Sequence, residues 1–213
     1  MEAPRYIVIE GPIGVGKTSL AKLLAEELRA RCIFEKVDEN PFLGKFYQDR
    51  AKHAFQTQIF FLLSRFQQQK LIGQGDLFQR VTLADYLFAK DRIFAHLNLD
   101  ENEVALYEQI YRLLDARIVK PDLVVYLQAR PEVLMQRIRK RGVDFERNIT
   151  APYLEELTRA YNEFFFQYSE TPLLVVHTSE IDFVERREDF DNLVREIRRM
   201  RGGTQYYQPI GSR

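Results

Sequence analysis

The chain has 213 residues, of which 46% are hydrophobic, and its 31 basic side chains balance its 31 acidic ones. This length and apolar content suit a single domain with a substantial core, and a net charge of zero argues against a nucleic acid polymer as partner. The lone cysteine, Cys32, excludes an internal disulfide, and no apolar run approaches the roughly 20 residues that span a bilayer.

Short apolar runs of strand type alternate with long helical patterns along the chain. We expect strands at 6–10, 32–37, 81–85, 123–127 and 173–177, and helices near 17–31, 41–72, 86–96, 101–120, 131–141, 152–168 and 184–200. This alternation is typical of an α/β protein whose five-stranded parallel sheet is covered by helices on both faces.

The two ends of the sequence lead to two further expectations. The first residues show neither the basic segment nor the long apolar core of a signal peptide, so we expect a cytoplasmic protein with no membrane segment. Residues 202–213 are rich in turn formers and have no periodicity. We therefore predict one domain over residues 1–201 and a C-terminal tail over 202–213 that is mobile or docks on a partner subunit.

The first strand pattern leads directly into a glycine-rich sequence. Residues 11–18 read G-P-I-G-V-G-K-T, which matches the phosphate-loop pattern G-x-x-x-x-G-K-[ST], and a helical pattern follows. The glycines allow backbone N–H groups to turn toward phosphates, Lys17 is expected to reach the β- and γ-phosphates, and the Thr18 hydroxyl is expected to bind Mg²⁺. The predicted nucleotide-binding residues are Gly11, Pro12, Ile13, Gly14, Val15, Gly16, Lys17, Thr18 and Ser19.

Carboxylates follow the second and third strand patterns, at the edge where open parallel sheets bind ligands. Glu35 can accept a hydroxyl proton, and Asp38 and Glu39 are nearby rivals that would otherwise be helix-entry charges. Asp85 ends the third pattern, where a Mg²⁺-associated acid of a phosphate-loop enzyme is expected, although a lone aspartate there is often only a cap. Asp91 lies six residues later, and a solvated helix charge is the alternative interpretation.

Polar residues interrupt the apolar face of the helical pattern over 41–72. Gln58 and Arg65 lie among phenylalanine, leucine and isoleucine side chains. A buried amide or guanidinium must find hydrogen-bond partners, and a ligand could supply them. The alternative is a two-sided helix that leaves both residues at the surface.

Arginines are concentrated at the end of the helical pattern over 131–141. Arg137 and Arg141 share a helix face by the i, i+4 rule, and Gly142 is expected to end the helix. The polar loop that follows has the form of a lid that could place Arg137, Arg141 and Arg147 over phosphates. The alternative is a charged helix face in water.

Together these residues resemble the deoxyribonucleoside kinase family, specifically the bacterial deoxyadenosine/deoxyguanosine kinases, across nearly the whole chain. The resemblance rests on Ile9-Glu10-Gly11, residues 35–43, Gln58 with Ser64-Arg65, Ala84-Asp85-Tyr86 with residues 91–95, and residues 137–142 with Glu146. It implies a phosphate-loop kinase fold with an arginine-rich lid, a homodimer, Mg²⁺, and ATP or another nucleoside triphosphate as phosphate donor.

The resemblance also implies catalytic and lid roles for single residues. Glu35 matches the general base for the sugar 5′-hydroxyl, and Arg137 matches an arginine that contacts the reacting oxygen and the phosphates. Arg141 matches a residue of the nucleotide lid. Glu146 is similar to a lid carboxylate near the acceptor's sugar.

Further matches concern the nucleobase and the metal. Gln58 matches a glutamine that pairs with the nucleobase edge, while Arg65 and Asp91 match an arginine–aspartate pair that reads purines or cytosine. Many family members carry an acid followed directly by arginine after the third strand, whereas this chain has Asp85-Tyr86. Gln79-Arg80 is an alternative register, but it precedes the apolar strand pattern. We therefore assign Asp85 to the metal site and the substrate site, and leave the role of the missing arginine unassigned.

The sequence thus predicts a nucleotide-salvage enzyme that uses a nucleoside triphosphate to phosphorylate the 5′-hydroxyl of a deoxyribonucleoside, deoxyadenosine and/or deoxyguanosine. A thymidylate or other nucleoside monophosphate kinase is the alternative enzyme, but thymidylate kinase should carry an Asp-Arg pair and small hydroxyl residues after the third strand, which this chain lacks. A GTP-binding switch should show an Asn-Lys-x-Asp sequence, which does not occur.

Overall fold

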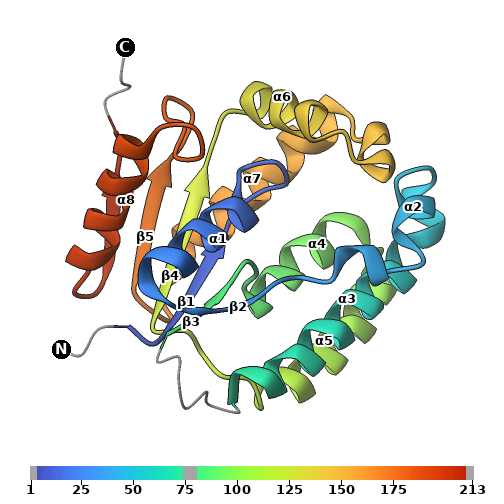
Figure 1. Ribbon diagram of the computed structural model, residues 1–213. Helices are drawn as coiled ribbons and strands as arrows, with labels where there is room; N and C mark the ends of the chain where they lie inside the picture. Colours follow the sequence, from blue (N-terminus) through green and yellow to red (C-terminus); the bar gives the residue numbers. More distant parts are fainter. Residues whose placement is uncertain (1–3, 74–80, 210–213) are drawn as a thin grey trace.

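The computed structural model describes residues 4–73 and 81–209, and a parallel β-sheet forms its centre (Figure 1). The neighbouring strands are parallel throughout, in the order β2-β3-β1-β4-β5-β6. The strands of this sheet are β1 (Tyr6–Glu10), β2 (Arg31–Ile33), β3 (Thr82–Ala84), β4 (Leu123–Gln128), β5 (Leu173–His177) and β6 (Thr204–Tyr207). The expected α/β class is therefore confirmed.

The sixth strand corrects the expectation of a five-stranded sheet. β6 lies within the segment 202–213 that we expected to form a tail, and it pairs with β5 from Thr204 opposite Leu173 onward. The first three side chains of β6 are exposed, so this edge strand has no apolar alternation from which it could be predicted. Residues 210–213 of the expected tail lie outside the described residues.

Helices connect the strands and cover the sheet. Those in the described residues are α1 (Lys17–Leu28), α2 (Leu43–Phe46), α3 (Arg50–Gly73), α4 (Asp91–Asn98), α5 (Glu101–Asp115), α6 (Pro131–Arg141), α7 (Ala151–Gln167) and α8 (Arg187–Arg199). Short 3₁₀ turns form η1 (Val37–Glu39), η2 (Phe88–Lys90) and η3 (Asp144–Asn148). The predicted helix over 41–72 is in fact two helices, because a turn closed by Gln48 N–H and Lys45 C=O separates α2 from α3.

The bounds of α6 agree with its sequence signals. Pro131 occupies the first turn, where its missing N–H has no intrahelical partner to lose. Gly142 ends the helix with a φ of 70°, and its N–H bonds to the carbonyl of Ile138. The lid sequence therefore begins at a defined helix end.

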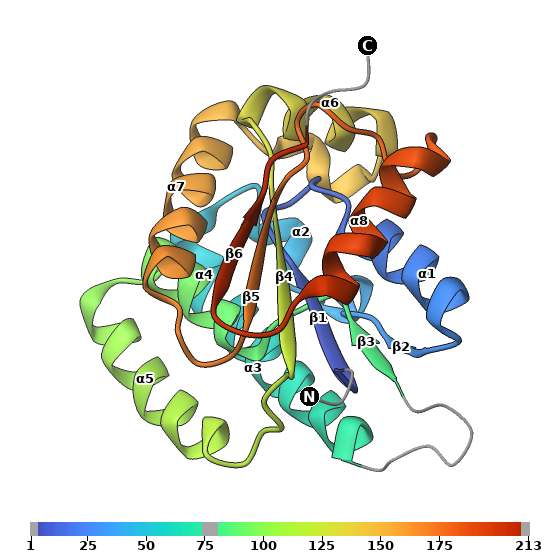
Figure 2. The same cartoon turned by 90° about the vertical axis from the view of Figure 1, so that its left-hand side faces the viewer.

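Alternate residues of the central strands point to opposite faces of the sheet. Ile7 and Val125 pack with α1 and α8 on one face, while Val8 and Tyr126 pack with α4 and α7 on the other. Figure 2 shows α1 and α8 on one side of the strands and α7 and α4 on the other. Helices thus cover both faces, which explains why the central strands read as continuous apolar runs.

The strand order brings three functional segments to one edge. β2, β3 and β1 are neighbours, and their carboxyl ends lead to Glu35, Asp85 and the phosphate loop, residues 11–18. Ligands of open α/β sheets bind outside these strand ends. None of the helices in the described part of the chain is long and apolar enough to span a bilayer.

Candidate active site

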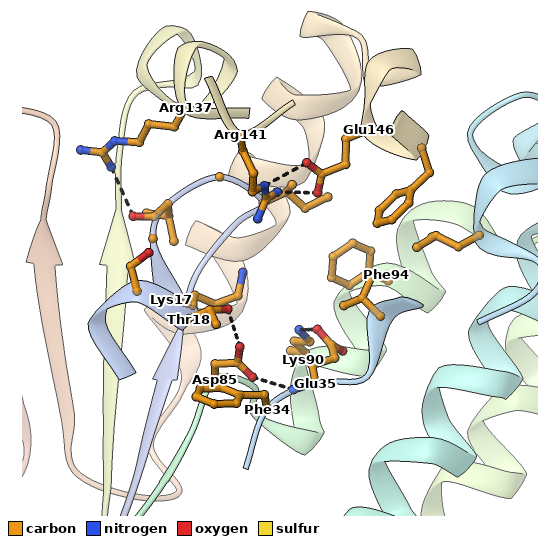
Figure 3. Close-up of a pocket in the computed structure, with 18 of the residues that line it drawn as sticks. Lys17, Thr18, Phe34, Glu35, Asp85, Lys90, Phe94, Arg137, Arg141 and Glu146 are labelled. Carbon is orange, nitrogen blue, oxygen red and sulfur yellow. Dashed lines mark hydrogen bonds and ion pairs between the residues drawn. The ribbon is translucent and has the colours of Figure 1, made fainter. Parts of the chain in front are cut away.

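A cavity of about 600 Å³ opens beside the phosphate loop at the carboxyl edge of the sheet (Figure 3). Its wall includes the phosphate loop, the segments after β2 and β3, residues 182–185, and parts of α2, α3, α4, α6, η3 and α7. Pockets for small ligands typically measure about 300 to 1,000 Å³. The cavity therefore has the size of a small-molecule site.

The phosphate loop has the conformation that its glycines allow. Gly14 and Gly16 have φ values of 83° and 104°, in the left-handed region that residues with a Cβ avoid, and α1 begins directly afterwards. The Lys17 ammonium donates to the Gly11 carbonyl at 2.7 Å. Burial, followed by the charge of Lys90, lowers the pKa of Lys17 to about 8. The N–H groups at the start of α1 and this lysine form a site suited to anions.

A buried aspartate joins the phosphate loop to the segment after β2. The Thr18 hydroxyl donates to Asp85 Oδ2 at 2.5 Å, and the Glu35 backbone N–H donates to Asp85 Oδ1 at 2.7 Å. The two predicted metal ligands are thus in contact. Among the described residues, no three histidine, cysteine, aspartate or glutamate side chains form a metal-binding group. The Thr18 and Asp85 oxygens fit Mg²⁺, which typically binds one or two protein oxygens together with phosphates and water.

Two cations hold the Glu35 carboxylate. Glu35 Oε1 accepts from Arg65 Nε at 2.7 Å, and Oε2 accepts from Lys90 Nζ at 2.8 Å. Burial would raise the pKa of Glu35, but the charges of Arg65 and Lys90 outweigh it and lower this pKa to about 2. Glu35 is therefore ionised at neutral pH.

The two rival carboxylates lie outside the site. Asp38 and Glu39 are exposed on η1, and Glu39 pairs with the exposed Lys36 at 2.7 Å. Neither is among the described residues that line the cavity, whereas Glu35 is. The geometry thus separates three carboxylates that the sequence could not.

The three residues expected to read a nucleobase contact one another. Gln58 Nε2 donates to the Asp91 backbone oxygen at 2.8 Å, and Arg65 forms an ion pair with the Asp91 carboxylate. That carboxylate also accepts from the Tyr107 hydroxyl at 2.8 Å. Gln58 and Arg65 line the cavity, but Asp91 is fully buried and is not among the described lining residues. Asp91 is placed to hold Arg65 rather than to touch a ligand.

Arg137 is bound to backbone oxygens. Its guanidinium donates to the carbonyls of Val15, Thr178 and Ile181 at 3.2, 2.9 and 3.3 Å. It lines the cavity, but Figure 3 shows its side chain turned away from Glu35. Arg137 thus connects the phosphate loop to the segment after β5.

The rest of the lid has a different arrangement. Arg141 forms an ion pair with the buried Glu146, and both residues line the cavity. Arg147 pairs with Asp144 at 2.8 Å on the surface and is not among the described lining residues. Of the lid cations named from the sequence, Arg141 has the position closest to the expected one.

Sequence reasoning missed Lys90. It ends an otherwise apolar run that begins at Tyr86, and a lysine there must reach either water or an opposite charge. That pattern was the available signal. Tyr86 itself is fully buried, and the alternative register at Gln79-Arg80 lies outside the described residues.

Comparison with known proteins agrees with this geometry. The family model of the deoxynucleoside kinases matches residues 7–200. The chain belongs to the deoxynucleoside kinase family. The deoxyguanosine kinase of Bacillus subtilis is 35% identical over 207 residues, which cover 94% of this chain and 99% of that protein. The deoxyadenosine kinase of Dictyostelium discoideum is 35% identical over 208 residues, covering 96% and 84%.

A solved structure extends the likeness to three dimensions. The structure of deoxyadenosine kinase from M. mycoides with bound dATP aligns with a TM-score of 0.79 and 27% sequence identity, covering 91% of this chain and 98% of that one. The resemblance read from the motifs is thus confirmed, and the fold is that of a phosphate-loop kinase. This deoxynucleoside kinase has Lys90, not an arginine beside Asp85, as the cation that reaches Glu35 after β3.

Proposed function

We propose that this deoxynucleoside kinase transfers the γ-phosphoryl group of ATP, or of a related nucleoside triphosphate, to the 5′-hydroxyl of deoxyadenosine and/or deoxyguanosine. The observation that carries the proposal is the position of Glu35. This ionised carboxylate lines one cavity together with the phosphate loop and the Gln58 and Arg65 side chains. A phosphate site, a proton acceptor and base-reading groups therefore share one space.

Glu35 is placed to accept the proton of the 5′-hydroxyl during transfer. The bond between the 5′-oxygen and the γ-phosphorus forms, the bond from that phosphorus to the β,γ-bridging oxygen breaks, and Glu35 takes the proton. With a pKa of about 2, Glu35 is a weak base. It orients the hydroxyl and takes the proton late in the transfer, because the loose transition state of phosphoryl transfer needs little activation of the attacking oxygen.

Thr18 and Asp85 are the residues that would hold Mg²⁺. When bound there, Mg²⁺ would neutralise negative charge on the phosphates of the donor. Lys17 adds a positive charge at the same phosphates. The short hydrogen bond between the Thr18 hydroxyl and Asp85 supports this assignment because it brings two hard oxygen ligands together.

Arg141 is the lid residue that we assign to the transferring phosphates. Its side chain is 47% exposed, and its ion-pair partner among the described residues is Glu146, so it can exchange that carboxylate for a phosphate. Arg137 would have to leave several backbone oxygens to make the same contact. We infer that Arg137 contributes by fixing the phosphate loop, and that Glu146 lies near the acceptor's sugar.

The polar groups at the acceptor end suit a purine. Arg65 keeps N–H groups beyond those bound to Glu35 and Asp91, and a guanidinium matches the O6 and N7 acceptors of guanine. The Gln58 amide matches the amino group and N7 of adenine. On the corresponding edge thymine presents O4 and a methyl group, which give the Gln58 oxygen no donor. Each unpaired polar group costs about 1 to 3 kcal/mol.

Relatives and sequence support the remaining parts of the proposal. The two relatives named as deoxyguanosine and deoxyadenosine kinases agree with a purine acceptor. We further propose a homodimer, as the family resemblance implies, and a cytoplasmic location. Nucleotide salvage is the role that this chemistry serves.

The test is a substrate panel with matched carboxylate variants. We expect kcat/KM for deoxyadenosine or deoxyguanosine to exceed that for thymidine by about 10- to 100-fold, as one or two mismatched groups predict. Glu35→Gln should lower kcat by about 10²-fold or more. Glu39→Gln, the same change on exposed η1, should match the parent. A parent that prefers thymidine refutes the purine assignment, and full kcat in Glu35→Gln refutes the role of Glu35.

A further inference from the structure

Lys90 is a buried charge at the wall of the active-site cavity. Only 2% of its surface is exposed, and its ammonium donates to Glu35 Oε2 at 2.8 Å. Buried ion pairs are often no more stabilising than apolar residues of similar volume. Fold stability alone therefore gives little reason for a lysine at this position. Lys90 and Glu35 both line the active-site cavity, which suggests that the lysine has a functional role.

The backbone around Lys90 is fixed by a second buried carboxylate. Glu10, at the end of β1, accepts from the Leu87 N–H at 2.6 Å through Oε2 and from the Gly11 N–H at 2.9 Å through Oε1. The Tyr161 hydroxyl donates to the same Oε1 at 3.2 Å. Glu10 thus connects the start of the phosphate loop to the segment that carries Lys90.

This connection places Lys90 near both the proton acceptor and the phosphate site. Lys90, Glu35 and Lys17 all line the same cavity. Figure 3 shows Lys90 beside Glu35 on the side of the cavity that faces Lys17 and Thr18. A second positive charge therefore lies where the 5′-hydroxyl and the γ-phosphate would meet.

We propose that Lys90 is a positioning residue that holds the Glu35 carboxylate toward the acceptor hydroxyl and adds its charge to that of Lys17. The proposal rests on the assigned role of Glu35 and extends it. It also gives a physical account of Tyr86, because a cation at 90 supplies the charge that the residue next to Asp85 lacks. The cations that act on the Glu35 carboxylate are Arg65, Lys90 and Lys17.

The experiment compares kcat and KM of Lys90→Met, Lys90→Gln and Lys90→Arg with those of the parent at one pH. Without the Lys90 ammonium, Glu35 Oε2 loses its donor, so kcat of the Met and Gln variants should fall by about 10²-fold, in the range seen on removing one preorganised electrostatic group. Their KM values should stay within about threefold of the parent, because Lys90 acts through Glu35 and not through the groups that bind the base. Lys90→Arg keeps a cation beside Glu35 and should recover most of the parent kcat.

Lys120→Met is the matched control. Lys120 forms an ion pair with Glu170 at 2.7 Å and is not among the described residues that line the active-site cavity, so its variant should keep the parent kcat and KM. Loss of packing at position 90 alone would change KM together with kcat and would lower the free energy of unfolding, which urea unfolding of each variant measures. If Lys90→Met fails to fold, Lys90→Gln carries the test.

The outcomes separate two failures. A parent with no phosphotransfer to any deoxynucleoside refutes the proposed function. A parent that is active, with folded Lys90→Gln showing a kcat within about twofold of the parent, refutes the role of Lys90, and so does a folded Lys90→Arg that is no more active than Lys90→Gln.

Discussion

Replacement of Arg65 by methionine should strongly destabilise the protein. Arg65 is 3% exposed and connects two carboxylates, Glu35 on the segment after β2 and Asp91 at the start of α4. In Arg65→Met, Asp91 stays fully buried and keeps the Tyr107 hydroxyl as a hydrogen-bond donor. A hydroxyl does not neutralise the carboxylate, so the variant carries an uncompensated buried charge.

The size of the effect follows from that charge. Breaking a buried pair by removing one partner typically costs about 3 to 5 kcal/mol. Loss of the stacking of the Arg65 guanidinium on the Phe61 ring, 4.9 Å from its centroid, acts in the same direction. For a chain of this size, each kcal/mol lowers Tm by roughly 2 to 4 °C, so the expected fall in Tm is about 6 to 20 °C.

A double variant tests the cause. Arg65→Met with Asp91→Leu replaces the pair by apolar groups and should recover most of the lost free energy of unfolding, because such replacements are often neutral or stabilising. Urea unfolding at pH 7, with linear extrapolation and a double-mutant cycle, measures each term. Arg92→Met is the control, since the Arg92 side chain is 45% exposed in its ion pair with Glu108, which should contribute about 1 kcal/mol or less.

Two results would contradict this reasoning. One is a loss below about 1 kcal/mol in Arg65→Met, which would mean that Asp91 reaches water or becomes protonated at little cost. The other is a double variant no more stable than the single one. Either result would show that Asp91 does not hold Arg65 in place.

Three further predictions concern the phosphate loop and pH. Because Lys17 has a pKa of about 8, triphosphate affinity measured by calorimetry should fall above about pH 8, and Lys17→Met should lose this dependence. Gly14→Ala should weaken triphosphate binding and lower the free energy of unfolding by about 1 to 3 kcal/mol, because φ is 83° and a Cβ would lie 2.8 Å from the Leu134 carbonyl oxygen. Gly44→Ala is the control and should not destabilise the protein, since no atom lies within 4 Å of the added Cβ. The pKa of Glu35 is lowered from 4.5 to about 2, so its ion pairs contribute fully to stability above pH 4.5, and this contribution is lost as pH falls toward 2. The free energy of unfolding of Glu35→Gln should therefore depend less on pH in this window than that of the parent.

Local signals were enough for much of the fold and for the conformation of the phosphate loop. The phosphate loop, the first and fifth strand patterns and α6 lie where the sequence predicts them, because each depends on residues within a few positions of one another. Glycines set the loop backbone, and Pro131 and Gly142 mark the ends of α6. Asp85 was also predictable, since the end of a parallel strand determines where its side chain lies.

Only the tertiary structure determined which charged side chains of the site contact one another. Glu35 meets Arg65 across 30 residues and Lys90 across 55, and no local pattern records that α3 and η2 pack against the segment after β2. The same packing buries Asp91 behind the cavity surface, while the contacts of Arg137 depend on where the segment after β5 runs. Burial gives these charges their effect, because a carboxylate or a lysine removed from water must find a partner, and only the folded chain determines which partner is within reach.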